Sequence, residues 1–226
     1  MDQELEFKFA VQGEADFKRL ADFLGRTELL TQRGVQQVNH FFDTASHQLH
    51  AQRMVLRLRE EAGIQRLTFK CDQEDLNAAG SATRRTEIEV SLTPAEALKV
   101  LQGELPVLQA LEERVTPENA AALTPLRELA EAAPLRYIGY FKNLRRRLER
   151  VPVQVDGDKV LLCFELDRCS FGPGDEEFEI EVEWTGELGT SAIEQALSAL
   201  LQAAGVEWQT APSKSQRFYA MKQASA

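Results

Sequence analysis

The chain has 226 residues, of which 43% are hydrophobic and 27% are charged, and this composition is typical of a globular protein with a sizeable core. The formal net charge of −10 argues against general affinity for nucleic acid or for an anionic membrane surface. No apolar run approaches the roughly 18 residues that span a bilayer. We therefore expect neither nucleic acid nor membrane among the partners, and a monomer or homodimer.

The chain begins directly with a charged, strand-like segment that lacks the features of a secretory or transit peptide, so we predict a cytoplasmic protein. Cys71, Cys163 and Cys169 fit neither a disulfide framework nor the spacing of a zinc site, and we interpret them as buried thiols. No Gly/Ser-rich linker divides the sequence. The prediction is therefore one domain, residues 1–226.

Charged and apolar residues alternate in the first predicted strand, residues 3–11, where Glu4, Glu6 and Lys8 are separated by apolar side chains. Because successive side chains of a strand point to opposite faces, one face is charged and the other apolar. The same alternation recurs in the segments 57–59, 67–70, 87–90 and 179–183.

The rest of the pattern predicts further strands near residues 36–43, 53–60, 64–71, 84–92, 136–150, 152–156, 159–168 and 177–184. Apolar residues at helical spacing predict helices near residues 14–24, within 94–132, and over 191–204. Thr93-Pro94-Ala95-Glu96 and Thr116-Pro117-Glu118 have the composition of helix starts. We interpret the segments 44–49, 73–82 and 213–222 as a turn, a mobile loop and a basic tail.

Strands sorted in this way, some acidic and some basic, favour a sheet that curls around a charged interior under an outer layer of helices. An inward-facing charge is costly unless it is paired or meets a ligand. Gathered carboxylates are typical of Mg²⁺ or Mn²⁺ sites, and gathered arginine and lysine side chains are typical of phosphate sites. A chain of phosphates complexed with metal is the ligand that satisfies both sets.

The pattern Glu4-Leu5-Glu6-Phe7-Lys8 resembles the ExExK signature of the CYTH superfamily, the triphosphate tunnel metalloenzymes. Further matches follow in the family's order, over about residues 1–220 in all. They are Phe41-Phe42-Asp43-Thr44, Leu56-Arg57-Leu58-Arg59, Leu67-Thr68-Phe69-Lys70, Arg85-Thr86-Glu87-Ile88-Glu89, Phe141-Lys142-Asn143-Leu144-Arg145, Phe164-Glu165-Leu166-Asp167, Phe178-Glu179-Ile180-Glu181-Val182-Glu183 and Ser213-Lys214-Ser215.

The resemblance implies an α+β fold, in which a closed eight-stranded antiparallel β-barrel forms a tunnel with a charged interior and helices packed outside. Family members hydrolyse inorganic triphosphate or thiamine triphosphate, or cyclise ATP to cyclic AMP. We expect a Mg²⁺- or Mn²⁺-dependent hydrolase that cleaves inorganic triphosphate to diphosphate and phosphate, because no nucleotide- or thiamine-reading element is evident. The alternatives are a thiamine triphosphatase, a class IV-type adenylate cyclase, and a non-catalytic polyphosphate- or nucleotide-binding module.

The resemblance also implies roles for individual residues. The basic residues implied to bind phosphate are Arg57, Arg59, Lys70, Arg85, Arg145, Arg147 and Lys214, with Arg85 and Arg147 the weaker candidates. The acidic residues implied to hold the metal are Glu4, Glu6, Glu87, Glu89, Asp167, Glu179 and Glu181. The resemblance implies that Glu4, Glu6 and Lys8 act in catalysis, and that Lys8 orients the phosphate chain or tunes the attacking water. Glu165 shares a face with Asp167 and belongs either to the acidic set or to a salt bridge at the rim.

Two groups of residues outside these motifs receive structural interpretations. His40, His47 and His50 have no accompanying ligand pattern and are interpreted as surface histidines. Trp184 and Trp208 are interpreted as residues that pack under helices, with a role in sandwiching a base or thiazole as the alternative.

Overall fold

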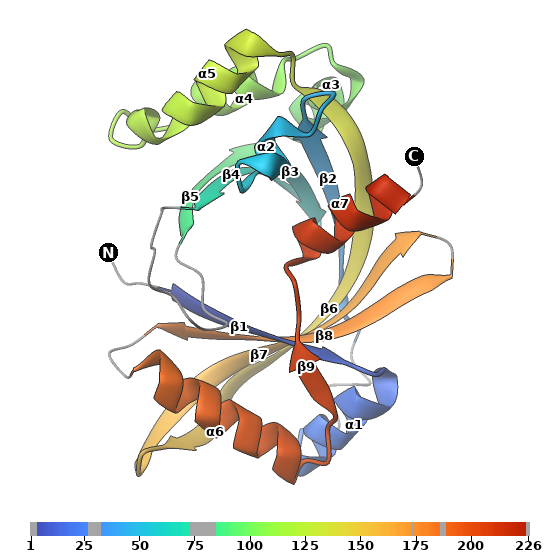
Figure 1. Ribbon diagram of the computed structural model, residues 1–226, viewed down its shortest axis with the longest axis vertical. Helices are drawn as coiled ribbons and strands as arrows, with labels where there is room; N and C mark the ends of the chain where they lie inside the picture. The colour runs from blue at the N-terminus through green and yellow to red at the C-terminus, as the bar shows by residue number, and fades with distance from the viewer. Residues whose placement is uncertain (1–3, 27–32, 73–84, 173, 186–188, 225–226) are drawn as a thin grey trace. The chain divides into compact units, whose positions relative to one another are not determined.

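The computed structural model describes residues 4–26, 33–72, 85–172, 174–185 and 189–224 (Figure 1). The strands are β1 Glu4–Val11, β2 Val35–Asp43, β3 Met54–Glu61, β4 Ile64–Asp72, β5 Arg85–Leu92, β6 Arg136–Val155, β7 Asp158–Gly172, β8 Asp175–Thr185 and β9 Trp208–Thr210. The helices are α1 Glu14–Phe23, α2 Gln48–Ala51, α3 Pro94–Gln102, α4 Val107–Glu112, α5 Thr124–Ala132, α6 Thr190–Ala203 and α7 Lys214–Ala224, with a 3₁₀ turn at Ala120–Leu123. The predicted loop 73–82 lies outside the described residues.

The strands form one sheet in the order β5-β4-β3-β2-β6-β7-β8-β1-β9, with nine strands among the described residues. The prediction of a closed eight-stranded barrel is therefore wrong, because this sheet has β5 and β9 as its two edges and does not close. At one end of the sheet, the short strand β9 occupies the outer edge of β1. Residues Phe9–Val11 of β1 pair with β8 on one side and with β9 on the other, so both edges of β1 are occupied there.

The described residues divide into two compact units, each assembled from separate stretches of chain. Within the described ranges, unit 1 comprises residues 4–26, 33–36, 143–172, 174–185 and 189–213, and unit 2 comprises residues 37–72, 85–142 and 214–224. The prediction of a single domain over residues 1–226 stays a prediction.

In unit 1, the strands β1, β7 and β8 bury their apolar faces beneath α1 and α6 (Figure 1). The antiparallel register places Phe7 beside Val182 and Phe9 beside Ile180. On α6 the apolar residues Ile193, Leu197 and Leu201 recur every four positions, which puts them on one face of the helix, and all three are fully buried. The predicted helix over residues 191–204 is confirmed within one residue at each end.

In unit 2, the apolar faces of β3, β4 and β5 form a second core with α3, α4 and α5. The predicted start of α3 is confirmed by its cap. The Thr93 hydroxyl accepts a hydrogen bond from the Glu96 N–H at 3.3 Å, and the Glu96 carboxylate accepts one from the Thr93 N–H at 2.9 Å. The second predicted start is wrong, because α5 begins only at Thr124, after the 3₁₀ turn.

Three local predictions are corrected by the backbone. Residues 136–155 form one continuous strand, whereas two strands were predicted near 136–150 and 152–156. The strand contains Pro152, and a strand tolerates a proline where its N–H is not needed for pairing. The predicted turn 44–49 leads into the short helix α2. The predicted basic tail forms helix α7, in which Phe218 and Tyr219 are buried.

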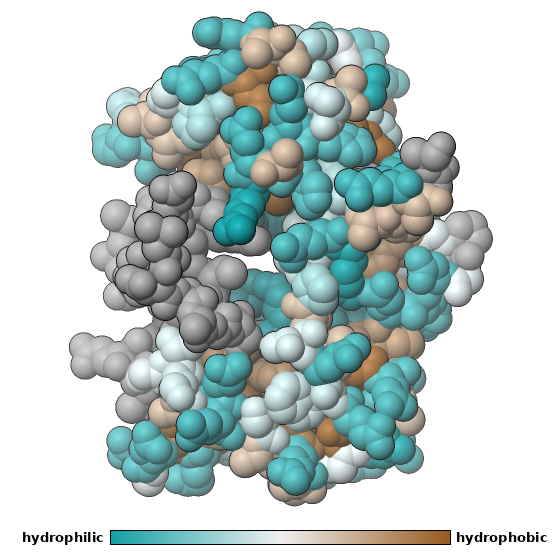
Figure 2. All heavy atoms as spheres, viewed as in Figure 1, coloured by the Kyte–Doolittle hydropathy of each residue, from teal (hydrophilic) through white to brown (hydrophobic). Residues whose placement is uncertain are grey.

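Hydrophilic residues predominate on the face shown in Figure 2, and the apolar residues visible there are scattered in small groups. Within the described part of the chain, no helix combines the length and hydropathy needed to cross a membrane.

The histidines of unit 2 are partly buried, and the side chain of His40 is 12% exposed. Its Nε2 lies 2.9 Å from Glu60 Oε1 and its Nδ1 lies 3.2 Å from the Tyr137 hydroxyl. His50 stacks on Tyr219, with ring centroids 4.0 Å apart. These histidines therefore contribute to packing.

Replacing His40 by Gln is expected to weaken the dependence of stability on pH. Burial lowers the pKa of His40 below its ordinary 6.5, and Glu60 offsets this only in part. As the pH falls below 6.5, the unfolded chain therefore binds this proton more readily than the folded chain, and the free energy of unfolding decreases. The free energy of unfolding is measured with urea at about pH 7.5 and about pH 5.5, and its decrease between these two pH values should be smaller in the variant than in the parent. Equal losses in both proteins would rule out this role for His40.

Candidate functional site

The pairing of β1, β7 and β8 gathers the charged residues of unit 1 on the sheet face opposite the helices. Lys8 is the direct neighbour of Glu181, and Glu6 is the neighbour of Glu183. On the other side of β8, Glu181 is paired with Glu165 and Glu179 with Asp167. Because side chains alternate along each strand, these residues face away from the apolar core.

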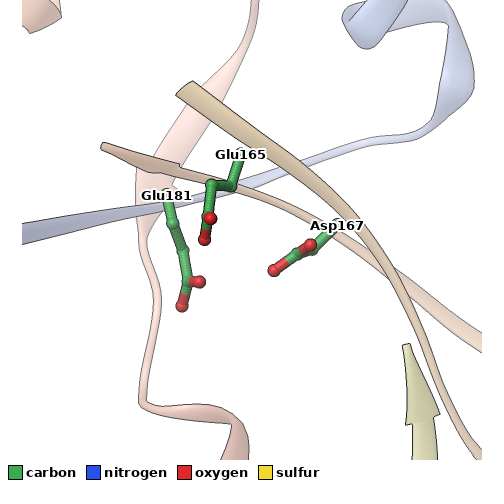
Figure 3. A group of neighbouring side chains, drawn as sticks. All are labelled: Glu165, Asp167 and Glu181. Carbon is green, nitrogen blue, oxygen red and sulfur yellow. The ribbon is translucent and has the colours of Figure 1, made fainter. Parts of the chain in front are cut away.

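Three carboxylates converge on this face and form a group that we call the acidic cluster, Glu165, Asp167 and Glu181. Each supplies an oxygen within 4.8 Å of the oxygens of the other two, and all three residues are buried. Figure 3 shows their carboxylate groups projecting from β7 and β8 toward a common space. Buried like charges repel, so this cluster requires a cation.

Arg145 supplies positive charge to the acidic cluster. Its Nε donates a hydrogen bond to Asp167 Oδ1 at 2.8 Å, and its Nη2 donates to Asp167 Oδ2 and to Glu181 Oε2, both at 2.6 Å. Arg145 also forms an ion pair with Glu165. Burial alone lowers the pKa of Arg145, but the hydrogen bonds with Asp167 and the three nearby carboxylates raise it overall. The guanidinium therefore stays charged.

The environment of the acidic cluster changes the acidity of Glu165. Burial raises its pKa, the charge of Arg145 opposes this, and the neighbouring carboxylates of Glu183, Asp167 and Glu181 raise it further, to about 7. The cluster therefore contains a carboxyl group that exchanges a proton near neutral pH.

Lys8 and Arg147 lie on the borders of the acidic cluster. The Lys8 ammonium is paired with Glu6 and lies 3.8 Å from Glu181 Oε1. Arg147 is half-exposed, and its guanidinium contacts Glu183 at 3.2 Å and the sulfur of Cys163 at 2.8 Å. Unit 1 thus brings cationic groups from β1 and β6 next to the acidic cluster, with Lys8 near Glu181 and Arg147 Nε 3.7 Å from Glu165 Oε1.

One face of β3, β4 and β5 in unit 2 carries the predicted site residues Arg57, Arg59, Lys70, Glu87 and Glu89. The register places Arg57 beside Thr68, and Thr68 beside Glu89. Lys70 forms an ion pair with Glu87 at 2.5 Å. Glu87 and Glu89 are exposed, which distinguishes them from the buried carboxylates of the acidic cluster.

Two other predicted residues of unit 2 have partly buried positions. The Nε of Arg59 donates a hydrogen bond to the buried Asn39 side chain at 3.0 Å. Lys214 is the first residue of α7. The backbones of Glu4 and Arg85 belong to β1 and β5, opposite Thr185 and Asp72, but their side chains lie outside the description.

Of the predicted residues, unit 1 brings together Lys8, Glu6, Arg145, Asp167 and Glu181, while Glu179 is fully buried beside Asp167 in the register. Glu165 was left open by the sequence and is a full member of the acidic cluster. The available signal was its alternation with Asp167 in Phe164-Glu165-Leu166-Asp167. That alternation fixes the face, but only the strand register shows that Glu165 lies opposite Glu181.

The chain is similar to known proteins over nearly its whole length. The CYTH domain family matches residues 2–219. A candidate adenylyl cyclase from Hippeastrum, described as having a dominant triphosphatase activity, superposes with a TM-score of 0.71 at 21% identity, over 96% of this chain and 95% of the other. A candidate adenylate cyclase from Bacillus halodurans superposes with a TM-score of 0.63 at 26% identity, over 97% of this chain and 100% of the other. No significant match was found among curated proteins. Since the family match spans nearly the whole sequence, the chain belongs to the CYTH domain family.

Proposed function

We propose that this CYTH protein is a Mg²⁺- or Mn²⁺-dependent enzyme that hydrolyses inorganic triphosphate to diphosphate and phosphate. The observation that carries the proposal is the buried acidic cluster held against Arg145 in unit 1. Membership of the CYTH family supports an enzyme that acts on a small-molecule triphosphate. We also keep a cytoplasmic location, and a monomer or homodimer that binds neither nucleic acid nor membrane, as predictions.

The donor set fits a hard divalent cation. Glu165, Asp167 and Glu181 offer only carboxylate oxygens, the ligands that Mg²⁺ and Mn²⁺ prefer, and their oxygens are within reach of one ion. We therefore assign the acidic cluster as the metal site, with Glu6 and Glu179 as neighbouring acidic groups. When bound, the metal supplies positive charge that neutralises phosphate oxygens during cleavage.

The residues of the chain itself supply binding, orientation and proton transfer. Arg145 and Lys8 carry the charges that bind phosphate oxygens, because a guanidinium forks onto two oxygens and an ammonium acts as a point charge. Glu165 is the candidate acceptor for a proton of the attacking water if Asp167 and Glu181 alone hold the metal, because burial raises the pKa of its carboxyl to about 7. Most of the rate enhancement comes from positioning and electrostatics, as is usual for phosphoryl transfer.

The basic residues of unit 2 remain predicted phosphate-binding residues. They are Arg57, Arg59, Lys70, Arg85 and Lys214, and Arg147 of unit 1 belongs to the same predicted set. Glu4, Glu87 and Glu89 likewise stay predicted acidic residues of the site. Individual substitutions, each assayed with triphosphate, test these assignments.

A second candidate function is cyclisation of ATP to cyclic AMP. It is favoured by the 26% identity with the Bacillus halodurans protein, which is described as a candidate adenylate cyclase. Thiamine triphosphate hydrolysis stays an alternative substrate within the same chemistry. A non-catalytic polyphosphate-binding module is the alternative that predicts binding without turnover.

A substrate comparison with the full chain distinguishes these candidates. Phosphate release is measured from inorganic triphosphate, thiamine triphosphate and ATP, with Mg²⁺ or Mn²⁺ and then with excess EDTA, and cyclic AMP is measured in the ATP samples. We expect the highest kcat/KM with inorganic triphosphate and complete loss of activity with EDTA. Cyclic AMP as the main product would instead establish the cyclase, and tight triphosphate binding without phosphate release would establish the binding module.

A further inference from the structure

Arg145 uses the same oxygen atoms that a metal ion in the acidic cluster requires. Its Nη2 group lies 2.6 Å from both Asp167 Oδ2 and Glu181 Oε2, and a further ion pair joins it to Glu165. One guanidinium is therefore in contact with every member of the acidic cluster. The side chain of Arg145 is only 13% exposed, so solvent does little to weaken these contacts.

A guanidinium and a divalent cation compete in such a site. Both are attracted by the same carboxylates, and each repels the other because both are positively charged. A metal ion that enters while Arg145 keeps its hydrogen bonds loses part of the ligand set and meets this repulsion. A phosphate group restores the lost ligands, because it offers the guanidinium an alternative bidentate partner. It also weakens the repulsion, because it brings additional negative charge.

We propose that Arg145 is a built-in counter-ion that holds the acidic cluster closed to metal until a phosphate group draws the guanidinium away. Metal alone then binds weakly, and metal and triphosphate each increase the affinity for the other by the same factor. The inference rests on the proposed function only in naming the phosphate compound. The competition between Arg145 and the metal is a property of the acidic cluster itself.

The neighbouring arginine provides a matched control. Arg146 belongs to the same strand as Arg145, but its Nη1 lies 2.9 Å from Glu14 Oε1 and it is not among the partners described for the acidic cluster. The substitutions Arg145→Gln and Arg146→Gln therefore change net charge equally, and only the first removes the counter-ion.

The test measures Mn²⁺ affinity of the full chain by electron paramagnetic resonance at about pH 8, without substrate and with a methylene-bridged triphosphate analogue. We expect Arg145→Gln to bind Mn²⁺ about tenfold more tightly than the parent without the analogue, whereas Arg146→Gln matches the parent. The analogue should increase the Mn²⁺ affinity of the parent by about tenfold, and that of Arg145→Gln by much less.

Unchanged or weaker Mn²⁺ binding by folded Arg145→Gln would overturn the inference, and so would a parent affinity that the analogue does not alter. Circular dichroism checks folding. If Arg145→Gln does not fold, Arg145→Lys replaces it, because an ammonium lacks the fork needed to hold three carboxylates together. The lysine variant should also bind Mn²⁺ more tightly, and unchanged affinity in it overturns the inference. Triphosphate hydrolysis by the parent is assayed separately. A parent that does not hydrolyse triphosphate contradicts the proposed function, whereas the Mn²⁺ affinities test the competition between Arg145 and the metal.

Discussion

Replacing Asp167 by Asn is expected to reduce kcat/KM for inorganic triphosphate by about 10²-fold or more. Asp167 is fully buried in the acidic cluster and accepts two hydrogen bonds from Arg145. Asparagine keeps the shape of the side chain but removes the negative charge that attracts a divalent cation. The reaction is measured over a range of Mg²⁺ concentrations, and half-maximal activity should require more Mg²⁺ in the variant.

The matched control for this prediction is Glu176→Gln in the neighbouring strand. Glu176 is an exposed carboxylate whose partner is Arg168, at 2.5 Å, and it does not belong to the acidic cluster. Its replacement should change kcat/KM by no more than a few-fold, since exposed ion pairs contribute little. Parent-like activity and Mg²⁺ dependence in a folded Asp167→Asn protein would remove Asp167 from the metal site.

Replacing Asp43 by Ala is expected to lower the free energy of unfolding by about 3–5 kcal/mol. Asp43 is fully buried and accepts hydrogen bonds from the N–H groups of Leu49 at 2.8 Å and His50 at 3.1 Å, and from the Tyr219 hydroxyl at 2.8 Å. One carboxylate therefore connects the end of β2 with α2 and α7. Its loss leaves several buried donors without their acceptor.

Tyr219→Phe is the graded comparison for Asp43→Ala. Burial raises the pKa of Tyr219 and the charge of Asp43 raises it further, so the hydroxyl stays protonated and donates to Asp43. Removing only this hydroxyl should lower the free energy of unfolding by about 1 kcal/mol. Urea unfolding of the parent, Asp43→Ala and Tyr219→Phe proteins measures the three free energies of unfolding, and the decrease from the parent should be smaller in Tyr219→Phe. A loss in Asp43→Ala no larger than that in Tyr219→Phe would show that the backbone hydrogen bonds to Asp43 contribute little.

The sequence allowed the local structure of the strands to be predicted well, because alternation reports directly on the two faces of a strand. Glu6 and Lys8 in β1, and Glu179 and Glu181 in β8, lie on the face opposite the buried Phe7, as alternation requires. The capping box at Thr93 was predictable for a similar reason, since all of its hydrogen bonds form within four residues.

Long-range pairing was not predictable in the same way. The sheet does not close as a barrel, and the occupant of the outer edge of β1 is β9, a strand of three residues that carries too few positions to show alternation. Helix α7 was missed because its buried residues, Phe218 and Tyr219, are adjacent in sequence and have no helical repeat of apolar positions around them.

The composition of the acidic cluster also depends on long-range pairing that the sequence alone does not show. Alternation placed Asp167 and Glu181 on charged faces, but the choice of which carboxylates converge depends on the register between β7 and β8. The resemblance implied a role for Arg145, one of three consecutive arginines, but its contacts with Asp167 and Glu181 are seen only in the structure.

Crystals of the full chain grown with Mn²⁺ and the methylene-bridged triphosphate analogue provide the most direct measurement. Anomalous scattering locates the manganese ion without reference to any assumption about its ligands. We predict an anomalous peak within about 2.5 Å of carboxylate oxygens of Asp167 and Glu181, with Arg145 turned toward a phosphate group. Manganese bound elsewhere, with Arg145 still hydrogen-bonded to both carboxylates, would contradict the assignment of the acidic cluster as the metal site.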